Sequence, residues 1–141
     1  MHQMQTYVEF RSDRFPACDR EEYQTSFGVW GKRLADVLRD SLRAEGFETE
    51  DPYAEDWGWN VPIVNDKFRL WVGCSNYKEY PDGFCCYIEP HTAFVRRFFR
   101  KVDTRERITE LQRALDKVLA ETAGITAKRW WTHEEFVNQE R

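Results

Sequence analysis

The sequence predicts an α+β protein, a two-layer sandwich in which two amphipathic helices cover one face of an antiparallel sheet in the order β-α-β-β-β-α-β. Two long segments repeat apolar residues at the three- and four-residue spacing of a helix. Five short segments rich in β-branched and aromatic residues are separated by turns. The 141 residues suffice for one domain, residues 1–141, and we expect fraying at residues 1–4 and 133–141.

The predicted helices cover residues 27–45 and 104–123. We expect Ser26 to cap the first helix and Gly46 to end it. Asp103, with Glu106 three positions later, resembles a capping box for the second helix. The apolar stripes consist of Leu34, Val37, Leu38 and Leu42 in the first helix and of Ile108, Leu111, Leu115, Val118 and Leu119 in the second.

The predicted strands cover residues 6–10, 57–64, 68–74, 84–88 and 125–132, and residues 47–50 also suit a strand. Pro62 indicates an edge position or a bulge in its strand because proline cannot donate a ladder hydrogen bond. Residues 91–101 suit a short helix as well as a strand. Short turns between consecutive strands favour an antiparallel meander.

Composition and charge exclude several classes of protein. The net charge of −4 argues against nucleic-acid binding, and no apolar run reaches the roughly 20 residues of a membrane span. The first residues lack a secretory signal, so we expect a cytoplasmic protein with reduced thiols. The four cysteines contain no Cys-x-x-Cys pair and the histidines are scattered, so we expect neither a metal nor a cofactor: Cys18, Cys74, Cys85, Cys86, His2, His91 and His133.

The segment Glu55-Asp56-Trp57-Gly58-Trp59 combines two carboxylates with two indoles. Adjacent carboxylates on a strand point to opposite faces and would not form a catalytic dyad. A structural role, a partner-binding surface and a general acid or base all remain open, and the first is favoured. No nucleophile elbow or phosphate loop occurs, so we expect no catalytic residues and lean against an enzyme. The candidate binding residues are Glu55, Asp56, Trp57, Trp59, Trp71 and Tyr87.

Charge is unevenly distributed along the chain. Residues 45–66 contain seven acids and no Lys, Arg or His, whereas residues 94–101 contain Arg96, Arg97, Arg100 and Lys101 and no acid. The two blocks either form a weak ion-pair network within the fold, which we favour, or form an outward surface that steers a charged partner. Phenylalanines interleave the basic block, as in nucleic-acid platforms, but docking on the core explains them better.

Trp130 and Trp131 are adjacent on the last predicted strand, so one indole should face the core and the other should face outward. The outward ring either anchors a partner or pairs subunits into a homodimer, or it is covered by the tail that carries Phe136 and Val137. The covered arrangement is slightly favoured.

Several landmarks together resemble a group of small bacterial proteins of unknown function that carry a Glu-Asp-Trp-Gly-Trp motif. The similarity rests on residues 31–35, residues 55–59, Gly73-Cys74 and Trp130, and extends over residues 7–131. It implies a bacterial, cytoplasmic, single-domain protein and no particular activity.

The hypothesis that the sequence favours is a non-enzymatic protein-binding domain, by analogy an immunity- or antitoxin-like inhibitor or a regulatory adaptor. Its motivation is an acidic, tryptophan-rich segment without a catalytic constellation. The alternative is a small-molecule-binding domain or minor enzyme whose aromatic pocket lies between sheet and helices, with Glu55 or Asp56 as the polar group.

Overall fold

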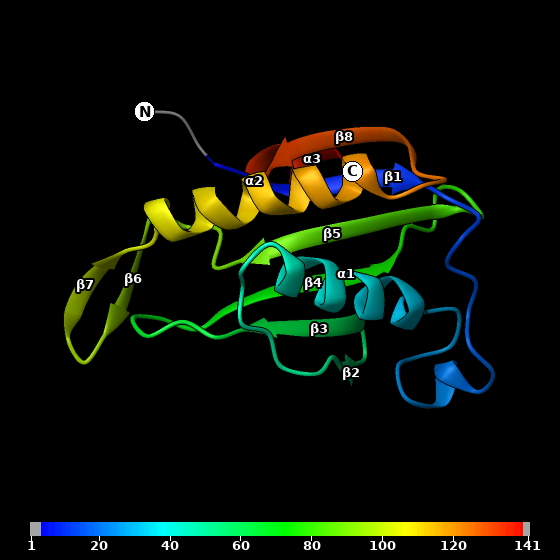
Figure 1. Ribbon diagram of the computed structural model, residues 1–141, viewed down its shortest axis with the longest axis horizontal. Helices are drawn as coiled ribbons and strands as arrows, with labels where there is room; N and C mark the ends of the chain where they lie inside the picture. Colours follow the sequence, from blue (N-terminus) through cyan, green and yellow to red (C-terminus); the bar gives the residue numbers. More distant parts are fainter. Residues whose placement is uncertain (1–3, 140–141) are drawn as a thin grey trace.

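The computed structural model describes residues 4–139, so the fraying expected at residues 1–3 and 140–141 lies outside it. Within this range the chain forms eight strands, three α-helices and one 3-10 turn (Figure 1). In chain order they are β1 (Gln5–Arg11), η1 (Glu21–Tyr23), α1 (Lys32–Ala44), β2 (Tyr53–Glu55), β3 (Gly58–Ile63), β4 (Leu70–Asn76), β5 (Gly83–Glu89), β6 (Phe94–Arg97), β7 (Arg100–Asp103), α2 (Arg105–Glu121), β8 (Thr126–Thr132) and α3 (His133–Gln139).

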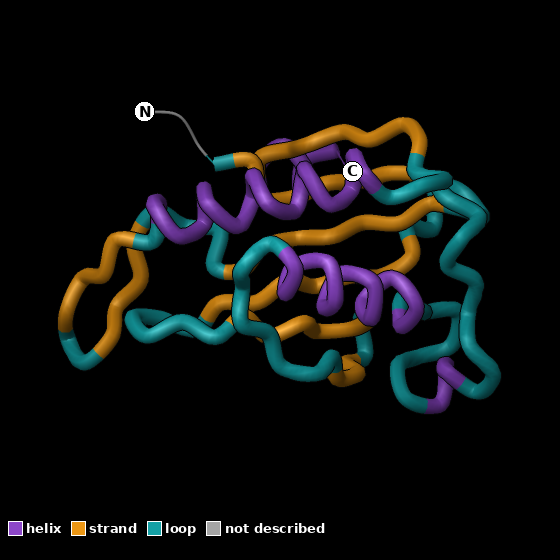
Figure 2. The backbone as a smooth tube through the Cα atoms, in the orientation of Figure 1, coloured by secondary structure: helices purple, strands orange, loops and turns teal. Residues whose placement is uncertain are grey.

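The main sheet has six strands in the order β2-β3-β4-β5-β1-β8, and every neighbouring pair is antiparallel. Helices α1 and α2 cover one face of this sheet side by side (Figure 2). The expected α+β sandwich with two helices on one face is therefore confirmed. On the opposite face, which we name the open face, α3 packs over β1 and β8.

The core lies between the sheet and the two long helices. Alternate residues of the central strands, such as Val8, Val72 and Cys86, are fully buried beneath the helices. Each such apolar side chain contributes about 1.5–3 kcal/mol when it leaves water. The helices contribute the predicted stripes, of which Leu34, Leu38, Leu42, Ile108, Leu111 and Leu115 are also fully buried.

The predicted start of the first helix is wrong. Helix α1 begins at Lys32 rather than residue 27, and its N-cap is Gly31. Ser26 instead donates from Oγ to the main-chain carbonyl of Asp56 at 2.8 Å. The carboxylate of Glu21 accepts the first free amides of the helix, which removes the need for a serine cap.

Three other boundaries differ from the expectation. Residues 47–50 form no strand, only a single bridge between Thr49 and Ile63. The ambiguous segment becomes a hairpin, β6–β7, which forms a separate two-stranded sheet. Thr104, not Asp103, is the N-cap of α2, although Asp103 accepts the amide of Arg105 at 2.9 Å. Pro62 was expected at an edge or a bulge. It pairs with Trp71 of β4 on one side, and on the other side the pairing of β3 with β2 ends at Asn60.

The chain end packs against the open face. Trp130 faces the helices and donates to Asp116 of α2 at 2.8 Å, while Trp131 faces the other way and donates to Glu9 at 2.9 Å. The opposite orientations of the two indoles are therefore confirmed. Trp131 is buried, and the guanidinium of Arg129 covers its ring. Phe136 of the tail stacks on Tyr7 instead of on Trp131.

Candidate functional site

Three of the six predicted binding residues form one aromatic cluster on the open face. The ring centroids of Trp57 and Trp71 are 5.6 Å apart, those of Trp57 and Tyr87 are 5.4 Å apart, and those of Trp71 and Tyr87 are 5.8 Å apart. Tyr87 lies across Gly73, where an added Cβ would meet its ring at 2.5 Å. Burial raises the pKa of the Tyr87 hydroxyl, so this group is neutral at physiological pH.

The turn that carries Trp57 depends on Gly58. This residue has φ +149°, and an added Cβ would lie 2.4 Å from the carbonyl oxygen of Cys74. Glycine is thus needed for the close approach of the turn to β4. The turn brings Trp57 back over the open face, where its side chain remains 36% exposed.

Trp59 does not join this cluster. It is 4% exposed, lies on the helix side of the sheet, and donates from its indole nitrogen to Glu21 at 2.8 Å. An aromatic pocket between sheet and helices that combines Trp57 with Trp59 is therefore absent from the described part of the chain. Trp59 has a structural role in the core.

Glu21 is a buried carboxylate that sequence reasoning missed, since it lies in a polar segment between the first predicted strand and the first predicted helix. Its side chain is 2% exposed and accepts four N–H groups, from Cys18, Gly31, Lys32 and Trp59, each at 2.8 Å. The negative charge lies at the start of α1, where the helix dipole favours it. No local pattern marks Glu21, because its partners come from three separate segments.

Glu55 and Asp56 flank the Trp57 turn. Glu55 is half-buried and Asp56 is exposed. In residues 4–139 neither carboxylate takes part in a hydrogen bond or ion pair. The partners are on the main chain, where Glu55 pairs with Gly58 and the carbonyl of Asp56 accepts from Ser26. The two side chains are accessible acids beside the aromatic cluster and do not form a paired catalytic site.

A groove of about 860 Å³ lies on the open face beside the cluster. Trp57 and Tyr87 line one part of it, and Phe136 of α3 lines another. Its charged lining consists of Lys78 and Glu79, not of Glu55 or Asp56. The groove can hold a ligand with an apolar or planar part.

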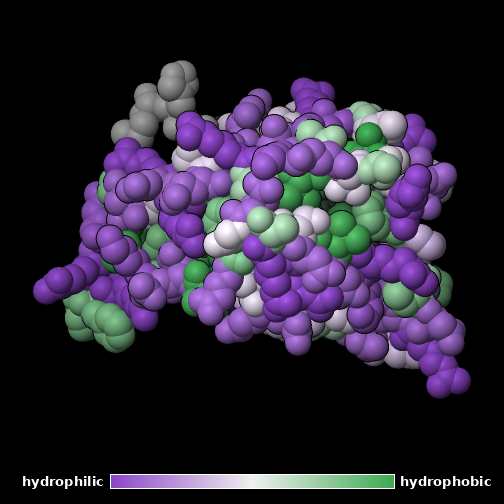
Figure 3. Space-filling view, viewed as in Figure 1, coloured by the Kyte–Doolittle hydropathy of each residue, from purple (hydrophilic) through white to green (hydrophobic). Residues whose placement is uncertain are grey.

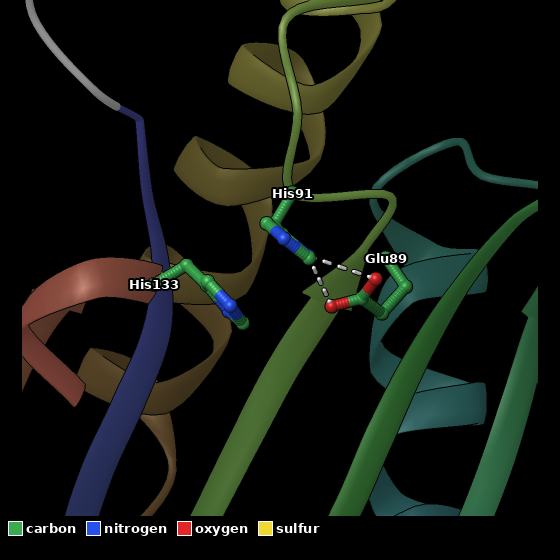
Figure 4. Close-up of side chains that lie close together, drawn as sticks. All are labelled: Glu89, His91 and His133. Atoms are coloured by element: carbon green, nitrogen blue, oxygen red, sulfur yellow. Dashed lines mark hydrogen bonds and ion pairs between the residues drawn. The ribbon is translucent and has the colours of Figure 1, made fainter. Parts of the chain in front are cut away.

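Two histidines that are 42 positions apart in the sequence meet at the end of β5. The rings of His91 and His133 stack with centroids 3.6 Å apart, and His91 Nδ1 lies 2.9 Å from Glu89 Oε1 (Figure 4). Burial and the neighbouring His91 lower the pKa of His133. The histidines are scattered in the sequence, and nothing in their spacing indicates that the first residue of α3 reaches the end of β5.

The β6–β7 hairpin, residues 94–103, forms the tip of one end of the molecule and carries exposed aromatic residues (Figures 1 and 3). Phe98 and Phe99 are 82% and 100% exposed. Both have positive φ, +52° and +65°, as in the two-residue turns of type I′ that usually carry Asn or Gly. We call this element the basic hairpin.

The cations of the basic hairpin are not neutralised within the fold. Among the described residues, Arg96, Arg97, Arg100 and Lys101 form no ion pair within 4 Å of a carboxylate. The acidic block pairs elsewhere, as Asp51 with Arg39 and Glu45 with Lys117. The favoured expectation of a network between the two blocks is therefore wrong, and the basic surface points outward.

The four cysteines are buried or half-buried. All four are free thiols. Cys86 faces the core beside Cys74, whereas Cys85 faces the groove. Burial raises the pKa of the Cys86 thiol well above its ordinary value, which makes it unreactive in the folded protein.

Comparisons of the chain with models of protein families, with curated proteins and with solved structures found no match. None of the helices in the described part of the chain is both long and apolar enough to cross a membrane. The case for a function therefore depends on the residues and their geometry.

Proposed function

We propose that this chain is a non-enzymatic protein-binding domain that inserts Phe98 and Phe99 into an apolar pocket with an acidic rim on its partner. The observation that carries the proposal is the exposure of both rings at the tip of a hairpin whose four cations form no ion pair with a carboxylate of the described residues. Exposed aromatic anchors beside arginines are the residue types that dominate binding energy at protein interfaces.

The backbone at the tip supports a role in binding. A left-handed conformation costs an ordinary L-residue roughly 1–2 kcal/mol, and here two successive phenylalanines adopt it. Asn-Gly would form the same turn at less cost and without two apolar rings in water. Strained backbone conformations of this kind are concentrated at functional sites, including those that bind other molecules.

The charge of the whole chain favours a protein partner over nucleic acid. The net charge of −4 opposes a phosphate backbone, whereas an acidic rim on a protein needs to complement only the hairpin. A small protein that blocks another by inserting such an element would act as an immunity- or antitoxin-like inhibitor. We place it in the bacterial cytoplasm, the setting that the resemblance of its tryptophan motif implies.

The test compares three forms of the protein in a pull-down from bacterial lysate. The first is wild type, and the second carries Phe98→Asn and Phe99→Gly, which removes both rings and keeps a type I′ turn. The matched control carries Tyr23→Asn and Phe27→Asn, two aromatic residues that are 87% and 92% exposed near η1 at the opposite end of the molecule.

We expect wild type and the control to retain an acidic protein in stoichiometric amount. The hairpin variant should lose this protein, although its melting temperature does not fall. Retention by the hairpin variant, or loss with the η1 variant alone, would contradict the proposal. Binding that disappears after nuclease treatment, or binding to anionic lipid vesicles, would assign the hairpin to a different class of partner.

The groove on the open face favours a second candidate function, the binding of a small molecule with a planar apolar part. Trp57 and Tyr87 would stack on such a ligand, and Lys78 and Glu79 offer polar contacts. A ligand there would change the fluorescence of wild type and of the hairpin variant equally but not that of Trp57→Ala, which separates the two candidate functions.

A further inference from the structure

The geometry points to a site for a divalent first-row transition ion, Zn²⁺ by preference, formed by Glu89, His91 and His133. One potential ligand atom from each side chain lies within 4.8 Å of the others. Two histidines and one carboxylate are the donor set of many protein sites for Zn²⁺ and its neighbours, whereas Mg²⁺ and Ca²⁺ prefer oxygen ligands.

Three separate backbone positions bring the donors together. Glu89 is the last residue of β5, His91 follows after Pro90, and His133 is the first residue of α3. Figure 4 shows His91 between the other two side chains. Each residue is half-buried, so an ion can reach the site from solvent while the surrounding chain restricts the ligands.

The distances between His91 and Glu89 fit an ion that replaces the proton of their hydrogen bond. His91 Nδ1 lies 2.9 Å and 3.1 Å from the two oxygens of Glu89. Ligand atoms on a tetrahedral ion with bonds of about 2.0 Å are roughly 3.3 Å apart, so this pair needs to open only slightly.

His133 is held by a neighbour that would orient it as a ligand. Its Nδ1 lies 3.1 Å from the hydroxyl of Tyr7, which leaves Nε2 for the ion. Partners of this kind fix the ring of a metal-binding histidine. Because the two imidazoles stack face to face, one ring must rotate to point its lone pair at a common ion.

The bound ion would link the end of β5 to the start of α3. Helix α3 supplies Phe136 to the groove, so this link would stabilise one side of the groove. Three protein ligands leave at least one coordination position open to water or to a group of a bound molecule. This site is independent of the basic hairpin, and its failure would leave the proposed protein-binding function untouched.

The experiment titrates tag-free, metal-stripped protein with ZnCl₂ by calorimetry and with CoCl₂ by visible absorption. We expect one ion per chain, a melting temperature that rises with the ion, and a cobalt spectrum without a thiolate charge-transfer band. His133→Gln, His91→Gln and Glu89→Gln should each weaken the affinity about 10–100-fold and abolish the rise in melting temperature.

The matched control is His2→Gln, which removes the remaining histidine of the chain and should bind as wild type does. Cys18→Ser tests the half-buried thiol in the same way. The assignment would be overturned if wild type bound no stoichiometric ion, if all three ligand variants kept its affinity, or if Cys18→Ser alone lost the ion.

Discussion

At the scale of single residues, Glu21 explains why the segment before α1 has a fixed structure. Its carboxylate joins the η1 loop, the start of α1 and the indole of Trp59. A buried charge is costly unless hydrogen bonds compensate it, and here four N–H donors do so. The loop, the helix and β3 are thus fixed relative to one another by one side chain.

Replacing Glu21 with alanine should lower the free energy of unfolding by about 3 kcal/mol, because buried donors lose a charged acceptor. Urea unfolding followed by far-UV circular dichroism measures this change without relying on Trp59 fluorescence. The matched control is Glu22→Ala, whose carboxylate accepts the amide of Gly28 at an exposed position and should cost less than about 1 kcal/mol. Equal losses for the two variants would show that Glu21 is not the anchor.

Sequence patterns locate some site residues and misplace others for identifiable reasons. Trp71 and Tyr87 share the open face because strand alternation holds in β4 and β5. Alternation would also place Trp57 beside Trp59, but Trp57 precedes β3 in the turn, so the two indoles end on opposite sides of the sheet. The meeting of His91 with His133 depends on tertiary contacts that no spacing encodes.

At the scale of elements, periodicity predicts the long helices and the central strands, because a buried stripe leaves a strong signal. The start of α1 was not predictable in this way, since its cap comes from a distant carboxylate. The basic hairpin was ambiguous because both of its faces are largely exposed and leave no apolar alternation. Its turn also uses Phe-Phe, which is not a turn signal.

Asp116 connects α2 to the edge strand β8 and should make this junction sensitive to acid. Its carboxylate accepts hydrogen bonds from Lys128 at 2.7 Å and from the indole of Trp130 at 2.8 Å. Both bonds lower the pKa of Asp116, and the bond from Lys128 has the larger effect. A carboxyl whose pKa is lower in the folded state contributes stability above its ordinary pKa and loses it as pH falls toward the lowered value.

Below about pH 4 the stability of wild type should therefore fall more steeply than that of Asp116→Asn. At neutral pH the two should differ by less than about 1 kcal/mol, because the pair is partly exposed. Urea titrations at several pH values between 2.5 and 6 (roughly spanning the ordinary carboxyl pKa) measure both slopes, and parallel slopes would contradict the assignment. Asp40→Asn, at a mostly exposed position on α1, serves as the control.

At the scale of the whole molecule, two pairs of exposed aromatic residues lie at opposite ends of the long axis, and one pair is on the basic hairpin. The basic hairpin lies at one end, and η1, with the loop joined to Asp56, lies at the other (Figure 1). Because the cations of the basic hairpin form no ion pair with a carboxylate of residues 4–139, their field extends into solvent and can steer an acidic partner toward Phe98 and Phe99. Charge would then govern how fast the complex forms, and the rings would govern how long it lasts.

The association rate with the captured partner should fall about tenfold when salt rises from about 0.01 M to about 0.15 M, as the Debye length shortens from about 30 Å to about 8 Å. Arg97→Gln with Arg100→Gln should remove most of this dependence and leave the dissociation rate nearly unchanged. Phe98→Asn with Phe99→Gly should do the reverse, because lost apolar anchors act mainly on dissociation. Stopped-flow mixing separates the two rates. An association rate that increases with salt would mean that like charges meet during binding, and would exclude the basic hairpin as the contact with an acidic partner.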